Sequence, residues 1–171
     1  MNTKLKIKHK LLLFPVVFAI VIAVVSLIFL KANSKSANLL KRIQNGYVVY
    51  QQDAIMLRNE LDKLQRGMQD AVASADIEKL NNTHEIYDTI KVYLHHIAKN
   101  EIGKNNGAVQ KTENEIAAYY ELSLDVSKSM INGDFSETLS ANIQAMVDQF
   151  NTIKSDLDNL IEHSKKESAQ E

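Results

Sequence analysis

The sequence predicts an all-α fold, in which an N-terminal transmembrane helix continues into an up-down-up-down antiparallel four-helix bundle. Three observations support this prediction. Five Gly and one Pro in 171 residues favour long uninterrupted helices. Apolar residues recur every three or four positions through most of the chain, and one continuous apolar run spans Leu11 to Leu30. Because the chain has no Cys, apolar packing rather than disulfides must hold the bundle together.

The predicted transmembrane helix is Leu11 to Leu30. Its residues carry no charge, and at about 1.5 Å per residue they match a hydrocarbon core roughly 30 Å thick. Pro15 lies near the start of the run, where a helix tolerates proline best. The alternative is a cleaved signal peptide with a small-residue site at Ala32-Asn33-Ser34, but its apolar region would be shorter, about 7 to 15 residues.

The basic N-terminal tail, residues 1–10, sets the expected orientation. It contains Lys4, Lys6, Lys8 and Lys10 and no acidic residue. Basic flanks remain in the cytoplasm, so residues 31–171 are expected on the periplasmic or extracellular side of a bacterial inner membrane. Residues 32–171 contain 15 Lys and Arg against 21 Asp and Glu. This acidic balance argues against binding to nucleic acid, which requires a basic face.

Four amphipathic helices are expected in the exported part, at about residues 36–73, 77–101, 108–131 and 136–166. The apolar stripe of the first helix comprises Leu40, Ile43, Tyr47, Tyr50, Ala54, Leu57, Leu61, Leu64, Met68 and Ala71. The fourth helix alternates steps of four and three, as in a coiled-coil seam. Its apolar positions are Leu139, Ile143, Met146, Phe150, Ile153, Leu157 and Leu160. Short connections between such helices predict antiparallel neighbours.

Turn and capping residues separate the four predicted helices. Asp76 is a suitable N-cap for the second helix. Residues 103–107, Gly-Lys-Asn-Asn-Gly, form the most loop-like segment of the chain. Gly133 can adopt the left-handed backbone that closes the third helix. Ser136 is then a suitable N-cap for the fourth helix, with Asp134 competing for the same role.

The lengths of the first and fourth helices predict a further span. From Lys31 to Ala73 the first helix rises about 64 Å, and from Ser136 to Glu171 the fourth returns about 54 Å, at 1.5 Å per residue. The fourth helix thus comes within about 10 Å of the bilayer. We therefore expect the chain to be the N-terminal part of a longer protein, cut just before a second transmembrane helix.

The layout and two local strings resemble the ligand-sensing region of methyl-accepting chemotaxis receptors and of related membrane sensor kinases and diguanylate cyclases. The strings run from Leu64 to Val72 (LQRGMQDAV) and, with a gap, from Tyr119 to Asp134 (YYELS and SMINGD). The resemblance implies a signal-transduction input module. Because the sequence shows no catalytic motif, we expect neither enzymatic activity nor a cofactor. The resemblance also implies a homodimer that binds a small molecule or a periplasmic binding protein and transmits by helix displacement.

Two arginines are candidates for binding an anionic ligand. Arg58 and Arg66 are eight residues apart on the first helix and share a face. The planar guanidinium group suits a carboxylate through paired hydrogen bonds. The alternative interpretation is solvated charges that pair with Glu60, Asp62 and Asp70.

Three tyrosines, Tyr50, Tyr119 and Tyr120, are candidates for lining a ligand cavity with their hydroxyl groups. The alternative is that they are core residues, which their helical spacing also favours. His84, His95 and His96 do not have the spacing of a helical metal site. No phosphate loop, nucleophile elbow or HExxH motif is present. The rival to a sensor is a single-pass membrane-anchored coiled-coil interaction protein.

Overall fold

The computed structural model describes residues 22–29, 31, 33–34, 39–104, 106–134 and 136–170. The chain divides into two compact units, Met1–Arg42 and Ile43–Glu171. Helices and turns account for the described parts of both units, and no strand occurs among them. The predicted all-α class is therefore confirmed.

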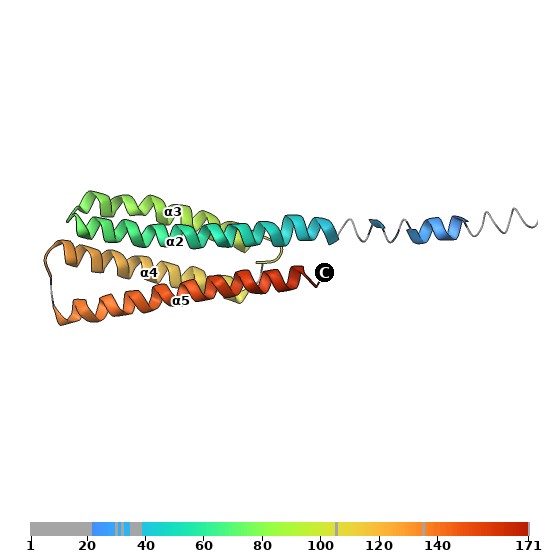
Figure 1. Ribbon diagram of the computed structural model, residues 1–171. Coiled ribbons are helices and arrows are strands. Elements are labelled where there is room, and N and C mark those ends of the chain that lie inside the picture. Colours follow the sequence, from blue (N-terminus) through green and yellow to red (C-terminus); the bar gives the residue numbers. More distant parts are fainter. Residues whose placement is uncertain are drawn as a thin grey trace, which may run out of the picture. The chain divides into compact units, whose positions relative to one another are not determined.

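The described residues of the second unit form five helical segments. A short π-helix, η1 (Ile43–Val48), leads into α2 (Val49–Ala73), which is followed by α3 (Ile77–Lys99), α4 (Gly107–Ile131) and α5 (Glu137–Ser168). Figure 1 shows α2 to α5 side by side, with consecutive helices running in opposite directions. Helix α2 packs against α3, α4 and α5, whereas the described residues of α3 and α5 make no close approach. Helices α2 and α4 therefore form the inner diagonal of this bundle.

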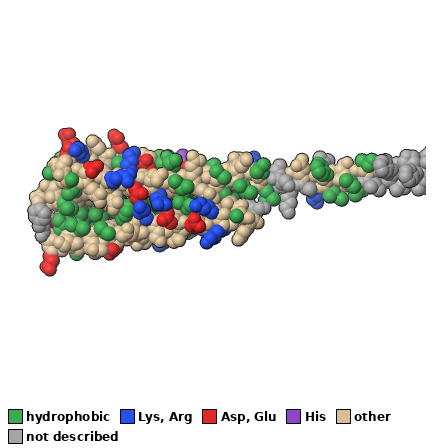
Figure 2. Space-filling model, in the orientation of Figure 1, with side chains coloured by type: hydrophobic (Ala, Val, Ile, Leu, Met, Phe, Trp, Pro, Cys, Tyr) green, Lys and Arg blue, Asp and Glu red, His purple; other side chains and the backbone are tan. Residues whose placement is uncertain are grey.

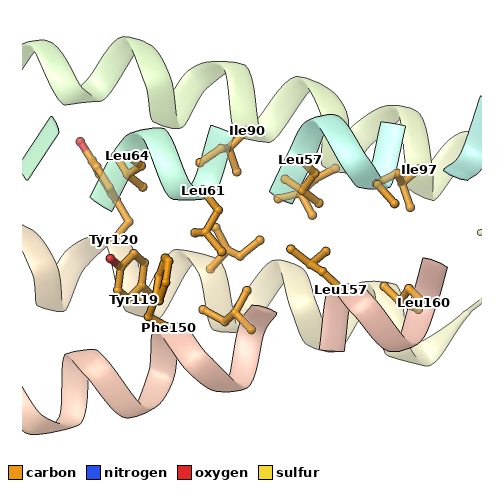
Figure 3. Packing of buried hydrophobic residues seen from close by; sticks show 14 of the residues in the cluster. Leu57, Leu61, Leu64, Ile90, Ile97, Tyr119, Tyr120, Phe150, Leu157 and Leu160 are labelled. Carbon is orange, nitrogen blue, oxygen red and sulfur yellow. The ribbon is translucent and has the colours of Figure 1, made fainter. Parts of the chain in front are cut away.

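The core contains most of the apolar positions that the helical pattern predicts. Leu40, the first position of the predicted stripe of the first helix, is 56% exposed and does not belong to it. In α2 the buried residues are Tyr50, Ala54, Leu57, Leu61, Leu64, Met68 and Ala71. Figure 3 shows side chains from all four α-helices meeting here, with Tyr119 of α4 beside Phe150 of α5. The two ring centroids lie 5.6 Å apart. Burial of such a stripe on each helix supplies the main driving force for the bundle.

The α2–α3 and α4–α5 turns lie at one end of the bundle. Three of the residues that shape them were predicted from the sequence, and one was not. Asp76 caps α3 by accepting hydrogen bonds from the backbone N–H groups of Glu78 and Lys79, and Ser136 caps α5. Gly133 has a φ of 77°, the left-handed conformation predicted for it. Ala75 takes the same role after α2 with a φ of 51°, although its Cβ disfavours this conformation.

The opposite end of the bundle departs from the sequence prediction. The first helix was expected to be α-helical without interruption, but residues 43–48 form a π-helix in which Gly46 and Tyr47 are buried. The Asn100 side chain donates a hydrogen bond to the Gly46 carbonyl at 3.2 Å and accepts one from the Ile102 N–H. These bonds tie the α3–α4 connection to η1. π-Helical turns are rare, and the local sequence carries no signal for this one or for its distant partner Asn100.

The described part of the first unit includes a helical stretch at residues 22–29. Its large apolar side chains are 50 to 70% exposed. The remainder of the predicted transmembrane segment, 11–21 and Leu30, lies outside the described residues, as do residues 36–38 at the predicted start of the first bundle helix. Among the helices that are described, none combines the length and the apolar character needed to cross a bilayer.

Candidate functional site

An apolar groove of about 330 Å³ lies between α2, α4 and α5. It is at the end of the bundle that carries the α2–α3 and α4–α5 turns, where Figure 2 shows hydrophobic side chains gathered at the surface. The groove is lined by Gln65, Met68, Gln69, Val72, Ala73, Tyr119, Val126, Ser127, Met130, Ile143, Met146 and Val147. Its volume is at the lower end of the range typical of small-molecule sites, roughly 300 to 1,000 Å³.

The groove coincides with an incomplete part of the predicted seam of α5. Leu139, Phe150 and later seam residues are buried as expected. Ile143 and Met146 are only partly buried, and their neighbour Val147 is 38% exposed. The sequence pattern alone would have predicted full burial here. Packing without voids is the rule in protein cores, so an apolar hollow with half-buried walls is a candidate ligand site.

Hydroxyl groups of α4 supply the polarity of this region. Tyr119 lines the groove and is 1% exposed. Burial raises the pKa of its phenol, while the neighbouring Ser123 hydroxyl acts in the opposite direction. The geometry between the two falls short of a hydrogen bond, and the Ser123 Oγ atom has no hydrogen-bond partner in the described part of the chain. One turn further on, Ser127 also lines the groove and is 4% exposed.

The three candidate tyrosines lie in three different places, and all are buried, as the core interpretation expects. Tyr119 alone reaches the groove between α2, α4 and α5. Tyr120 stacks on Tyr87 of α3 with the ring centroids 3.9 Å apart, and its hydroxyl lies 3.2 Å from Nδ1 of His84. Tyr50 lines a separate cavity at the opposite end of the bundle. They therefore do not form one site.

The two candidate arginines also have separate environments. Nη1 of Arg58 donates to Oδ1 of Asp158 at 2.8 Å, which joins α2 to α5. The alternative interpretation of a solvated ion pair named acids of the same helix as partners, whereas Arg58 pairs with an acid of α5. Asp62 instead pairs with Lys154 of α5 at 2.9 Å. Arg66 is exposed, and no described residue pairs with it.

The cavity at the η1 end has a more polar lining and encloses about 360 Å³. Its walls include Tyr50, Asn106, Asn159, His163 and Glu167. Burial, and secondarily the charge of Glu167, raises the pKa of Tyr50 to about 12. The cavity lies among the start of α2, the α3–α4 connection with the start of α4, and the end of α5.

Tyr50 predicts a loss of stability at high pH. Its pKa is about 12 in the folded chain against 10.0 as a free side chain. As the pH rises, the Tyr50 phenol therefore loses its proton in the unfolded chain before it does so in the folded chain. The contribution of the protonated phenol to the free energy of unfolding is complete below pH 10 and is lost as the pH rises toward 12. We expect Tyr50→Phe to reduce the loss over this interval by about 2 kcal/mol. Chemical denaturation of both proteins at pH 9.5 and 11.5 measures the loss of unfolding free energy. An equal loss in Tyr50→Phe and in the unaltered chain would contradict the raised pKa of Tyr50.

A metal centre finds no support in the described residues, among which no three His, Asp or Glu side chains are grouped suitably. His84 lies 3.6 Å from Asp88 and His96 lies 4.0 Å from Asp53. His95 is exposed on the outer face of α3. These contacts are those of surface histidines.

Sequence reasoning found Tyr119 but missed the rest of the groove. Its walls come from three helices, so no local motif contains them. One signal was present, because Ser123 and Ser127 occupy buried positions of α4 where apolar residues would normally continue the stripe. Comparisons with protein-family models, with curated proteins and with solved structures gave no match. The resemblance to bacterial sensory regions therefore remains a prediction.

Proposed function

We propose that this chain is the extracytoplasmic ligand-sensing input module of a bacterial transmembrane signal-transduction protein. The observation that carries the proposal is the apolar groove, because its lining comes from α2, α4 and α5 together. A ligand in such a groove contacts three helices at once. Its binding energy can therefore favour one arrangement of α5 relative to α2 over another.

The contacts between α5 and its neighbours suit a small displacement. Outside the core, α5 is joined to α2 by Arg58–Asp158 and Asp62–Lys154, and to α4 by Lys111–Asp156 at 2.6 Å. Their side chains are between 25 and 58% exposed. Ion pairs at such exposure contribute little each, about 0 to 1 kcal/mol. Breaking and re-forming these ion pairs would therefore add little to the cost of a shift of α5.

The proposal places the bundle outside the cytoplasm, anchored by residues 11–30. The basic tail supports this orientation, and the uncharged apolar run supports the anchor. The absence of Cys allows a direct test. A cysteine introduced by Ser155→Cys on the exposed face of α5 should react with a membrane-impermeant maleimide in intact cells. Thr3→Cys in the tail should react only after permeabilisation, and the reverse pattern would contradict the topology.

Blocking the groove should remove ligand binding without unfolding the bundle. Val147 is 38% exposed at the groove, and Val92 is 51% exposed on α3, away from it. Small molecules that raise the melting temperature of the full chain should lose this effect in Val147→Trp and keep it in Val92→Trp. A thermal-shift screen of a compound library measures both. Compounds that stabilise the two variants equally would show that the groove is not the binding site.

One observation favours the rival function of a membrane-anchored interaction protein. Val48, Val49, Ile55 and Met56 leave apolar surface exposed on η1 and α2, at 39 to 50% of each side chain. Exposed apolar patches often mark protein interfaces. The interaction protein would require this surface and not the groove. Loss of partner association in Ile55→Asp with normal association in Val147→Trp would support it over the sensor.

A further inference from the structure

We propose that the groove selects a small uncharged ligand with an apolar body and a single hydrogen-bonding group, which is bound by the hydroxyl of Ser127. This inference rests on the proposed function, since it specifies the ligand class of the same groove. It draws on the composition of the walls, on the state of the buried hydroxyl groups and on the position of the methionines.

The walls of the groove exclude charged ligands. None of the lining side chains is ionised at neutral pH, and the polar ones are Gln65, Gln69, Tyr119 and Ser127. A carboxylate or ammonium group that entered would lose its water without meeting an opposite charge. Because that desolvation is strongly unfavourable, a neutral molecule is favoured. Arg58 and Arg66 are not among the lining residues, so the anionic ligand suggested by the arginines does not fit this groove.

Ser127 differs from three other buried hydroxyl groups of the bundle. Thr83, Thr112 and Ser164 are buried as well, and each donates a hydrogen bond to a carbonyl of its own helix. Ser127 is 4% exposed and makes no hydrogen bond with any described residue. The fully enclosed unpaired oxygen nearby is that of Ser123, whereas the Ser127 hydroxyl lines the groove and is available to a hydrogen-bonding group of a ligand.

Methionines surround the place where the apolar body would lie. Met68, Met130 and Met146, from three different helices, line the groove. Thioether side chains adapt to irregular shapes and make favourable contacts with aromatic rings. An aromatic alcohol has an aromatic body for the methionines and a hydroxyl group for Ser127. We therefore choose 2-naphthol as the probe.

The methionines also provide the measurement. The chain has five methionines, three of which line the groove. Met56 lies outside the groove, is 39% exposed on the outer face of α2 and serves as an internal reference. The full chain, carrying ¹³C-methyl methionine in lipid nanodiscs, would be titrated with 2-naphthol, with naphthalene and with 2-naphthoate. We expect 2-naphthol to shift the methyl signals of the three groove methionines and to leave that of Met56 unchanged. Naphthalene should bind about fivefold more weakly, as expected for loss of one neutral hydrogen bond, and 2-naphthoate at least tenfold more weakly.

Ser127→Ala tests the hydrogen bond directly. It should weaken 2-naphthol binding about fivefold and leave naphthalene unchanged. Because the variant and the unaltered chain are compared with the same probe in the same nanodiscs, partition of that probe into lipid cancels. The matched control is Ser164→Ala, which removes a buried hydroxyl of α5 outside the groove and should change neither affinity.

Two failures are distinguishable. If the groove methyl signals shift but Ser127→Ala has no effect, or 2-naphthoate binds best, the ligand class is wrong while the groove remains a binding site. If no probe shifts the groove methyl signals, the groove itself is not a ligand site and the proposed function loses its main support.

Discussion

Gly103→Ala is expected to lower the free energy of unfolding by about 3 kcal/mol, at the upper end of the usual range for overpacking. Gly103 is buried in the connection between α3 and α4. A Cβ at this position would overlap the backbone carbonyl of Ile97 and lie 3.0 Å from Cε2 of Tyr50. The carbonyl belongs to the last turn of α3 and cannot move away as a flexible side chain could. The connection must therefore shift as a whole.

The control for this substitution is Gly107→Ala, four residues later at the start of α4. A Cβ there meets nothing within 4 Å. Replacing glycine by alanine without strain reduces the freedom of the unfolded chain, so we expect no loss or a gain of up to about 1 kcal/mol. Denaturation of the two full-length variants, followed by circular dichroism, separates these effects. Equal stability of the two would mean that the α3–α4 connection is not packed as described.

Leu61→Ala is expected to cost a similar amount, about 2 to 5 kcal/mol. Leu61 is fully buried in α2, the helix that packs against all three others. Truncation removes its transfer free energy and leaves a cavity that surrounding helices can fill only in part. Ile55→Ala on the same helix is the matched control, because Ile55 is 43% exposed and its truncation should cost at most about 0.5 kcal/mol. Comparable losses in the two variants would contradict the assigned core face of α2.

The parts of the fold that local residue pattern determines could be predicted from the sequence. The apolar stripe of α2 from Tyr50 to Ala71 and the capping roles of Asp76, Gly133 and Ser136 agree with the structure. Helical periodicity decides which face is buried, and a cap depends on one side chain and the backbone beside it. Neither requires knowledge of distant residues.

The features that depend on tertiary packing could not be predicted. The π-helix at residues 43–48 has a partner in Asn100, more than fifty residues away. The ion pair between Arg58 and Asp158 joins residues that only the bundle brings together. Ala75 adopts a left-handed backbone that its residue type disfavours, because the α2–α3 turn requires this conformation.

The groove also depends on tertiary packing, because its walls come from three helices. Its position was nevertheless indicated in part by Tyr119 and by the serines of α4. The polar cavity with Tyr50 lies at the other end of the bundle, beside the start of α2 and the end of α5.

The most direct test of the proposed mechanism is the distance between α2 and α5 with and without a bound probe. Because the chain lacks cysteine, spin labels can be attached after Asn59→Cys on α2 and Ser155→Cys on α5, both at exposed positions. A reference pair, Asn59→Cys with His95→Cys, reports on α2 and α3, which should move together. Pulsed electron resonance on the full chain in nanodiscs, with 2-naphthol, should shift the α2–α5 distance distribution and leave the reference unchanged. Occupancy of the groove, confirmed by the methionine signals, with an unchanged α2–α5 distribution would contradict the mechanism.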